Sequence, residues 1–319
     1  MAPARAPLRV GVVGAGYLGS IHARIYAGME SVRLVGVADT HKETAAAIGR
    51  KYGCEHYTEP EALIGKVDAV NIVVPTSRHQ EVAEPYLEAG IPTLVEKPVA
   101  HSLAAAQRLV ETAERCGTPL LVGHSERFNH GLKVLLRFVP KPRLIEAQRL
   151  GPYRERVADV DVVTDLMIHD LDFVLSLHGA EPVRMSAMGA RVVTSLVDIA
   201  NVRLEFADGS AANLSASRVS EGVYRRIRAF DRGVYASVNL VDHHVDVALH
   251  DRDAGNGEGL EVKTEKVDYK AMAQPLQAEL AHFVEVAQGI SAPRVSGRDG
   301  LRALKWVQDI LGEINGSLS

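Results

Sequence analysis

The chain of 319 residues has little cysteine, no excess of positive charge and no long apolar run. Its two cysteines, Cys54 and Cys116, have no partner at a ligand spacing, so the sequence predicts neither a disulfide framework nor a cysteine zinc site. No apolar run is long enough to span a bilayer. The net charge of −4 disfavours nucleic acid and an anionic membrane surface as main partners.

The composition is that of a soluble globular protein, and the length allows two domains with sizeable cores. The basic stretch Met1–Arg9 precedes an apolar run, as in a signal peptide. That run is the strand of a glycine motif, and its removal would destroy the fold. We therefore expect a cytoplasmic protein.

The glycine motif is the most informative stretch of the sequence. The apolar run Leu8–Val13 predicts a buried parallel strand, and Gly14, Gly16 and Gly19 form G-x-G-x-x-G at the start of a predicted helix. Such a turn directs backbone N–H groups and the positive end of the helix dipole at one point, which suits a pyrophosphate. Gly14 would permit the turn, Gly16 the approach of the phosphate, and Gly19 close packing of helix on strand.

A second strand, Val32–Ala38, ends at Asp39, about 20 residues after the motif. A carboxylate at this position can accept hydrogen bonds from both ribose hydroxyls of an adenosine. Asp39 could instead only cap the helix that begins near His41. Together with the glycines, it predicts a dinucleotide site.

Residues 1–123 alternate strands and helices, which predicts a doubly wound parallel sheet, the Rossmann arrangement. Ligands bind such sheets at the carboxyl ends of the strands. Five predicted strand ends carry distinctive residues, which supports one shared site: Gly14, Asp39, Pro75-Thr76, Glu96-Lys97-Pro98 and Gly123-His124.

Residues 124–319 have a different pattern, with strand-like alternation between Arg143 and Val267, one helix over Asp165–Leu177 and two helices at the end. The pattern predicts an α+β domain with a large open, mostly antiparallel sheet. Val202, Leu204 and Phe206 are candidates for one face of it. An open sheet needs cover, so a homodimer or homotetramer is expected.

Two groups of residues could carry chemistry. Lys97, at a strand end and followed by Pro98, could aim its ammonium group into a cleft and take part in proton transfer; it could also simply pair with Glu96. Asp165 and His169, at i and i+4 of one helix, could orient a substrate and take a proton. Alternatively, Asp165 serves the helix end after Thr164 as N-cap, and His169 is a core histidine. Metal binding by Asp165, His169 and Asp170 or Asp172 is disfavoured, because no second histidine pair accompanies them.

These residues resemble a known family, the Gfo/Idh/MocA oxidoreductases. The similarity rests on the glycine motif, Val37-Ala-Asp39, Val74-Pro-Thr76 with His79, Glu96-Lys97-Pro98 and Asp165-x-x-x-His169. It implies a Rossmann domain that binds a pyridine nucleotide, and a sugar or cyclitol bound between the two domains. The implied catalytic residues are Lys97, Asp165 and His169. The implied cofactor-binding residues are Gly14, Gly16, Tyr17, Leu18, Gly19, Asp39, Pro75, Thr76, His79, Glu96 and Lys97.

Within the family, Gly123–Asn129 and Asp165–Asp172 resemble the branch that oxidises UDP-N-acetylglucosamine at C3, although His130 stands where that pattern often has proline. UDP favours cationic and aromatic neighbours. We therefore expect substrate-binding roles for Lys97, Asp165 and His169, together with Arg127, Asn129, Tyr153, Arg154 and Arg156.

The sequence thus predicts an NAD-dependent oxidoreductase that transfers hydride between nicotinamide and a secondary alcohol of a UDP-N-acetylhexosamine. NAD is favoured over NADP because Asp39 would repel a 2′-phosphate. A dehydrogenase of a free sugar or inositol, and a non-catalytic nucleotide-binding redox sensor, are the alternatives. Whether Lys97 or His169 is the base stays open.

Overall fold

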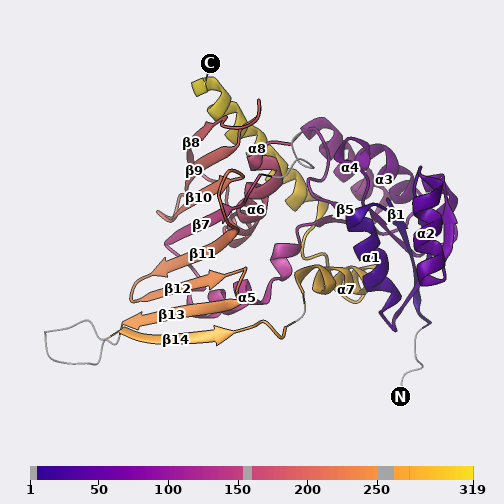
Figure 1. Cartoon of the computed structure of the whole chain (residues 1–319), viewed down its shortest axis with the longest axis horizontal. Coiled ribbons are helices and arrows are strands. Elements are labelled where there is room, and N and C mark those ends of the chain that lie inside the picture. The colour runs from indigo at the N-terminus through magenta and orange to yellow at the C-terminus, as the bar shows by residue number, and fades with distance from the viewer. Residues whose placement is uncertain (1–5, 154–159, 251–261, 273, 319) are drawn as a thin grey trace, which may run out of the picture. The chain divides into compact units, whose positions relative to one another are not determined.

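The computed structural model describes residues 6–153, 160–250, 262–272 and 274–318, and the chain forms two compact units (Figure 1). The first unit holds residues 1–125 and 276–304, and the second holds 126–275 and 305–319. The contiguous domains expected from the sequence, 1–123 and 124–319, differ from these units because 276–304 returns to the first. Its helix α7 (Pro275–Ala287) buries Leu280 and Phe283 in the hydrophobic core of the N-terminal sheet.

The first unit is built on a six-stranded sheet in the order β3-β2-β1-β4-β5-β6, in which every neighbouring pair is parallel. This confirms the predicted doubly wound Rossmann sheet. The sequences of these strands are apolar because both faces of the sheet are covered. The strands are β1 (Leu8–Val13), β2 (Val32–Ala38), β3 (Glu55–Tyr57), β4 (Ala69–Ile72), β5 (Thr93–Glu96) and β6 (Leu120–Gly123).

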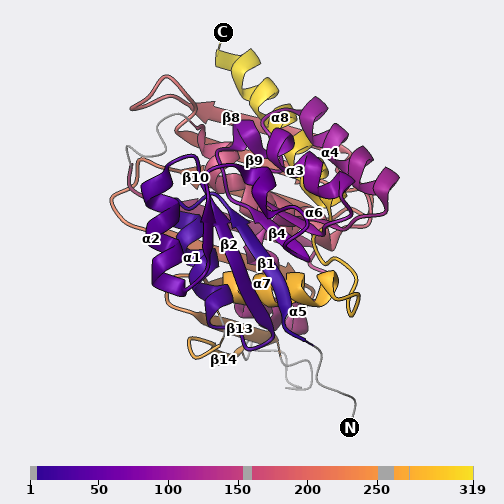
Figure 2. The same cartoon turned by 90° about the vertical axis from the view of Figure 1, so that its right-hand side faces the viewer.

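Right-handed crossovers place the early helices of this unit on one face of the sheet and the later ones on the other. On the first face, Tyr26 of α1 packs in one hydrophobic cluster with Val10 of β1 and Phe283 of α7, which lies beside β1 in Figure 2. The elements are α1 (Tyr17–Ala27), α2 (Lys42–Tyr52), η1 (Pro60–Leu63), η2 (Thr76–Arg78), α3 (His79–Glu88) and α4 (Leu103–Cys116).

The second unit is built on an eight-stranded sheet in the order β14-β13-β12-β11-β7-β10-β9-β8. Neighbours are antiparallel except for β7 and β10, so the predicted large and mostly antiparallel sheet is confirmed. The strands are β7 (Leu144–Leu150), β8 (Arg184–Ala190), β9 (Ile199–Glu205), β10 (Ala211–Ser217), β11 (Tyr224–Asp231), β12 (Val234–Asn239), β13 (His244–His250) and β14 (Val262–Asp268).

Helices cover one face of this sheet, as Figure 1 shows. Val202 and Leu204 of β9, and Phe206 after it, are buried as the alternation predicted. One covering helix, α5, is preceded by Asn129, whose side chain caps it; its nine residues were too short a pattern to be recognised. The remaining elements are η3 (Ser125–Phe128), α5 (His130–Phe138), η5 (Val163–Met167), α6 (Ile168–Leu177) and α8 (Gly297–Leu318). In the described part of the chain, no helix is both long and apolar enough to cross a membrane.

Candidate functional site

The glycine turn between β1 and α1 has the geometry that the sequence predicts. Gly14 has a φ of +95°, in the left-handed region, and a Cβ there would lie 2.3 Å from the carbonyl oxygen of Val73. A Cβ on Gly19 would lie 1.8 Å from the carbonyl oxygen of Gly14, so helix and strand approach as only glycine allows. A Cβ on Gly16 would meet nothing within 4 Å. The turn therefore leaves open space where a phosphate would approach the backbone.

Asp39 is tied to this turn rather than only to the following helix. Its Oδ2 accepts a hydrogen bond from the backbone N–H of Ala15 at 2.7 Å, and its Oδ1 accepts one from the N–H of His41 at 2.8 Å. One carboxylate thus serves both the glycine turn and the start of α2, so a role at the helix start alone is wrong. Its side chain stays 16% exposed, so part of it faces solvent beside the turn.

A pocket of about 250 Å³ opens beside these residues. It is lined by backbone and side chains from the ends of β1, β2 and β4, which is where a doubly wound sheet binds its ligand. Tyr17 is 74% exposed and Leu18 is half-buried at the first turn of α1. The cavity, the open space at Gly16 and the carboxylate of Asp39 together fit the adenosine part of a dinucleotide. The lining residues are Val13, Gly14, Gly16, Ala38, Asp39, Thr40, His41, Pro60, Val73, Val74, Pro75, Arg78 and Val82.

His79, a residue expected at the cofactor, is buried among backbone carbonyls, and Thr76 is half-buried at the start of η2. The His79 Nδ1 lies 3.0 Å from the carbonyl oxygen of Pro98, and Nε2 lies 3.0 Å from that of Val74. Burial lowers the pKa of His79 more than these carbonyls raise it, so the ring is neutral at neutral pH and carries one N–H. The ring links the loop after β4 to Pro98, and both of its nitrogens face the protein.

Lys97 follows β5 and is half-buried. The preceding residue, Glu96, is buried, and its Oε2 accepts a hydrogen bond from the N–H of Lys97 at 3.2 Å. Its Oε1 lies 3.2 Å from Nε2 of His22. A Cβ on Gly123 would lie 2.9 Å from the carboxyl carbon of Glu96, so the glycine that ends β6 makes room for this carboxylate.

Burial raises the pKa of Glu96, but His22 and Lys97 lower it by more, and the net shift is downward. Glu96 is therefore a buried carboxylate that stays ionised at neutral pH. The alternative of an exposed lysine paired with Glu96 is wrong about the exposure, because Lys97 is half-buried. Glu96 does interact electrostatically with Lys97, but its carboxylate lies inside the protein against His22.

Asp165 and His169 lie where η5 meets α6, in the second unit. Residues 163–167 form a π-helical turn that holds Asp165, and His169 is the second residue of α6; both side chains are half-buried. The prediction that Thr164 is the N-cap is wrong. Asp161 caps this segment, because its carboxylate accepts hydrogen bonds from the N–H and the hydroxyl of Thr164, both at 2.8 Å. π turns occur frequently at functional sites, which agrees with the roles expected of these two residues.

The other two acids of α6 are held by arginines. Asp170 accepts hydrogen bonds from Arg149 at 2.7 and 3.0 Å, and Glu126 lies 3.1 Å from the same guanidinium. Asp172 accepts two from Arg127, at 2.7 and 3.0 Å. In the described residues no group of His, Cys, Asp or Glu side chains is arranged to hold a metal ion. Asp170 thus ties α6 to strand β7, Asp172 ties it to η3, and both are poorly placed as metal ligands.

The expected contacts to UDP fall into three classes. Arg127 is committed to Asp172, and Asn129 caps α5 by accepting from the N–H of Gly131 at 2.9 Å, so both have structural partners. Tyr153 is 39% exposed and available to a ligand. Arg154 and Arg156 lie outside the described residues.

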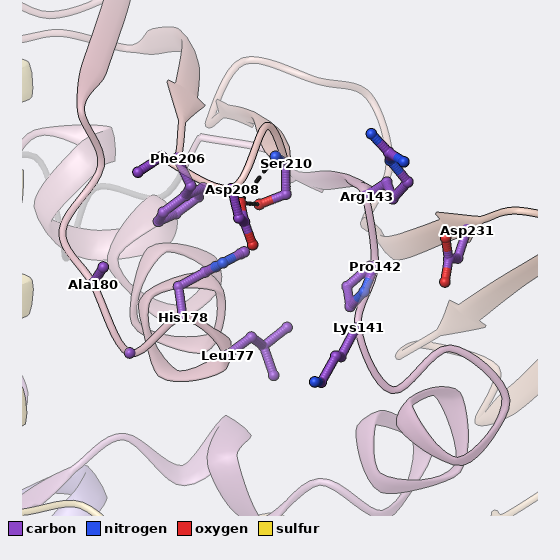
Figure 3. Close-up of a pocket in the computed structure, with 12 residues that line it drawn as sticks. Lys141, Pro142, Arg143, Leu177, His178, Ala180, Phe206, Asp208, Ser210 and Asp231 are labelled. Carbon is purple, nitrogen blue, oxygen red and sulfur yellow. Dashed lines mark hydrogen bonds between the residues drawn. The ribbon is translucent and has the colours of Figure 1, made fainter.

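A second pocket, of about 600 Å³, lies at one end of the eight-stranded sheet and contains none of the expected site residues (Figure 3). His178 stacks on Phe206 with ring centroids 3.6 Å apart, and in the figure it points toward Asp208. The lining includes two exposed cations, Lys141 and Arg143, but also the carboxylates of Asp208 and Asp231. This mixed charge does not select one class of ligand.

Two partners of residues singled out in the sequence were missed, His22 beside Glu96 and Arg149 on Asp170, and so was Asn71, which contacts His22. His22 lies three residues after Gly19 and is fully buried, as is Asn71 within the apolar strand β4. A polar residue in an otherwise apolar, buried pattern was the available signal, because such a group needs a partner.

The sequence matches two family models. Residues 8–124 match the NAD-binding Rossmann fold of the oxidoreductase family GFO/IDH/MocA, and residues 142–234 match the GFO/IDH/MocA C-terminal domain. Together the two models span more than half of the chain.

Among characterised relatives, UDP-N-acetylglucosamine 3-dehydrogenase of Acidithiobacillus ferrooxidans is 38% identical over 296 residues, which are 92% of each chain. Its solved structure superposes with a TM-score of 0.90 over 99% of this chain and 100% of that one. An inositol 2-dehydrogenase of Rhizobium meliloti is 28% identical over 76% of this chain and 79% of that one. The structure of scyllo-inositol dehydrogenase from Lactobacillus casei with bound NAD(H) and scyllo-inositol, 18% identical, shares the fold with a TM-score of 0.81 over 98% of each chain.

Proposed function

Because the chain belongs to the Gfo/Idh/MocA family of oxidoreductases, we propose that it is an NAD-dependent dehydrogenase that oxidises the C3 hydroxyl of a UDP-N-acetylhexosamine. The observation that carries this proposal is the full-length match to the Acidithiobacillus ferrooxidans enzyme, at 38% identity. It is supported by the presence of Lys97, Asp165 and His169, the three residues expected to act on a substrate hydroxyl.

The first unit would hold the cofactor. The open backbone at Gly16 would receive the pyrophosphate, and Asp39 would accept hydrogen bonds from the adenosine ribose. Bound there, the nicotinamide would supply the redox chemistry by accepting a hydride from the sugar carbon.

Loss of a hydride from a secondary alcohol requires that its hydroxyl proton pass to a base. We propose Lys97 and His169 as the two candidates for this proton, with Asp165 orienting the substrate or the imidazole. The variants Lys97→Met and His169→Asn distinguish the two candidates. The variant that lacks the base should lose the acidic limb of the pH profile of kcat. The other variant should have a lower kcat and keep that limb.

NAD is proposed over NADP because of Asp39. A 2′-phosphate on the ribose would lie against this partly buried carboxylate, and like charges at close range repel. His41, which is 83% exposed, lies 3.3 Å from Asp39 and would offset part of this repulsion when it is protonated.

A free sugar or an inositol is the second candidate substrate. It is favoured by the relatives named inositol 2-dehydrogenase and by the use of Arg127 inside the protein, which removes one cation from the set expected for UDP.

We also propose a homo-oligomer, a dimer or a tetramer. The interface would be the sheet face of the second unit opposite its helices, over which Figure 1 shows no helix; its side chains are polar, as at Gln148, Asn201 and Arg203, so the contacts between subunits would be polar. Light scattering coupled to size exclusion would give the mass; a monomer at working concentration contradicts the proposal.

Thermal unfolding with ligands tests the substrate class. A ligand that binds the native state raises the melting temperature by mass action. The proposal predicts a shift of the melting temperature with NAD⁺ and a further shift when UDP-N-acetylglucosamine is added. It also predicts that UDP-N-acetylglucosamine leads to NADH formation. UDP, free N-acetylglucosamine and myo-inositol should not give both the further shift and NADH. A further shift with myo-inositol or the free sugar alone would favour the second candidate.

A further inference from the structure

The two residues that flank Lys97 are each held by a buried histidine from a different helix. Glu96, before it, lies against His22 of α1, and Pro98, after it, lies against His79 of α3. His22 is 0% and His79 is 1% exposed. A buried polar side chain costs free energy unless it makes contacts of this kind, so both histidines need a reason to be there.

His22 belongs to a chain of polar contacts between α1 and the strands β4 and β5. The hydroxyl of Tyr26 donates to Oδ1 of Asn71 at 2.9 Å, and Nδ2 of Asn71 lies 2.9 Å from Nδ1 of His22. The amide of Asn71 thus donates to Nδ1, which leaves the proton on Nε2, 3.2 Å from the carboxylate of Glu96. Nε2 of His22 thus faces this carboxylate at close range, with an alignment that falls short of a straight hydrogen bond.

His79 acts on the other side of Lys97. Its neutral ring has one N–H for two carbonyls, those of Pro98 and Val74. Pro98 is buried whereas Val74 is half-buried, and a buried carbonyl has the greater need of a donor. We therefore assign the proton of His79 to Nδ1, which donates to Pro98.

Both helices start at the proposed cofactor site. His22 is three residues beyond Gly19 in the helix that the glycine turn opens, and His79 directly follows Arg78, which lines the adenosine pocket. We propose that His22 and His79 are positioning residues that hold the Glu96–Pro98 segment from its two sides, and so set the place of the Lys97 ammonium group relative to the glycine turn. The inference rests on the proposed function in giving Lys97 a role in proton transfer.

Few other charges face this segment among the described residues. Glu96 interacts electrostatically with His22, Lys97 and His79, and Glu279 of α7 acts on Tyr26 at the far end of the chain of contacts. The pKa of Glu96 is held below its ordinary value by His22 and Lys97 against the effect of burial. The carboxylate beside Lys97 is therefore charged throughout the neutral range.

Four variants test the assignment, because asparagine and glutamine each reproduce one nitrogen of histidine. A Gln amide reaches the position of Nε2, and an Asn amide reaches that of Nδ1. His22→Gln and His79→Asn keep the contacts to Glu96 and Pro98, and His22→Asn and His79→Gln lose them. We call His22→Asn and His79→Gln the losing pair, and His22→Gln and His79→Asn the keeping pair. In the losing pair we expect kcat to fall about tenfold or more, while KM for NAD⁺ stays within about twofold of wild type. In the keeping pair we expect kcat to stay within about threefold of wild type.

A second readout does not depend on turnover. The rate at which acetic anhydride labels Lys97 across pH 7–10, followed by mass spectrometry against the other lysines, reports the environment of its amine. Glu96→Gln should move the labelling profile of Lys97 to lower pH, because the ammonium group loses a negative charge that interacts with it. We expect the losing pair to change the Lys97 profile and the keeping pair to reproduce that of wild type.

Thr118→Val is the matched control. It removes another buried hydrogen bond of the same unit, from the Thr118 hydroxyl to Leu87 at 2.9 Å, and should lower the melting temperature without moving the Lys97 profile. Equal kcat and equal labelling within each histidine pair would overturn the proposal. If the wild type turns over no sugar, the proposed function fails; if Lys97→Met keeps full kcat, Lys97 has no role in proton transfer. In either case the labelling profiles still decide whether the histidines position Lys97.

Discussion

The carbonyl oxygen of Gly14 lies 1.8 Å from where the Cβ of any other residue at Gly19 would be. The strand end and the helix start therefore touch through backbone atoms. Gly19→Ala cannot be accommodated by a side-chain shift, and we expect a loss of about 2 kcal/mol or more in the free energy of unfolding, by urea titration, together with loss of NAD⁺ binding.

Gly16→Ala is the contrasting variant in the same turn. A Cβ at Gly16 meets no atom within 4 Å, so stability without ligand should stay within about 0.5 kcal/mol of wild type. The methyl group would nevertheless occupy the space proposed for the pyrophosphate. We expect NAD⁺ affinity, by calorimetry, to fall about tenfold or more. An unchanged NAD⁺ affinity would show that the pyrophosphate does not bind at this turn.

Cofactor preference should depend on Asp39. Asp39→Asn keeps an acceptor for the N–H of Ala15 but removes the negative charge. We expect the ratio of kcat/KM for NAD⁺ over that for NADP⁺ to fall about tenfold, mainly through a lower KM for NADP⁺. A wild-type protein that uses NADP⁺ as well as NAD⁺ would show that Asp39 does not set the preference.

Arg127 should matter to stability through Asp172. Its guanidinium makes two hydrogen bonds to a carboxylate that is 2% exposed, so Arg127→Met leaves a buried charge without its partner and should cost about 3 kcal/mol in urea unfolding. The double variant with Asp172→Leu should recover most of this loss. If instead the single variant keeps its stability and raises KM for the UDP-sugar, Arg127 serves the substrate.

Acid stability should depend on Asp198, a buried carboxylate in the second unit. It accepts hydrogen bonds from the N–H groups of Val192, Val193 and Thr194 at 2.7–2.9 Å and from Arg218 at 2.8 Å. Burial raises the pKa of Asp198, but the backbone donors lower it by more, so the net pKa lies well below its ordinary value. A depressed native pKa adds stability that is complete above the unfolded pKa, near 4, and is lost as the pH falls below it.

Asp198→Asn should therefore cost about 3 kcal/mol at pH 7, and the difference from wild type should narrow between pH 5 and pH 3. Asp68→Asn, which breaks an exposed pair with Arg9, is the control and should cost less than about 1 kcal/mol. A difference at Asp198 that is constant with pH would mean that its charge does not contribute.

The parts of the site that could be predicted are local in sequence. The glycine turn, Asp39 and the segment Glu96–Pro98 each stand at the end of an apolar strand, and the alternation of strands and helices brings such ends to one edge. The bounds of β1 and β2 agree with the predicted strands Leu8–Val13 and Val32–Ala38 for the same reason, since an apolar run is a property of a short window.

The parts that were missed depend on partners distant in sequence. The pattern of α7 shows that one face is buried, but not that Leu280 and Phe283 pack on the N-terminal sheet. Likewise the type of residue did not show that Arg127 is paired with Asp172, or that the ring of His79 faces two carbonyls. A charged or polar side chain indicates that a partner exists, and only the fold identifies it.

The most direct test of the account follows the hydrogen that leaves the sugar. UDP-N-acetylglucosamine carrying deuterium at C3 is incubated with NAD⁺ and the protein, and the reduced cofactor is analysed by mass spectrometry. The account predicts that deuterium appears in the NADH and that the initial rate is lower than with unlabelled sugar. Reduced cofactor without the label, or reduction by myo-inositol or free N-acetylglucosamine but not by the UDP-sugar, would contradict it.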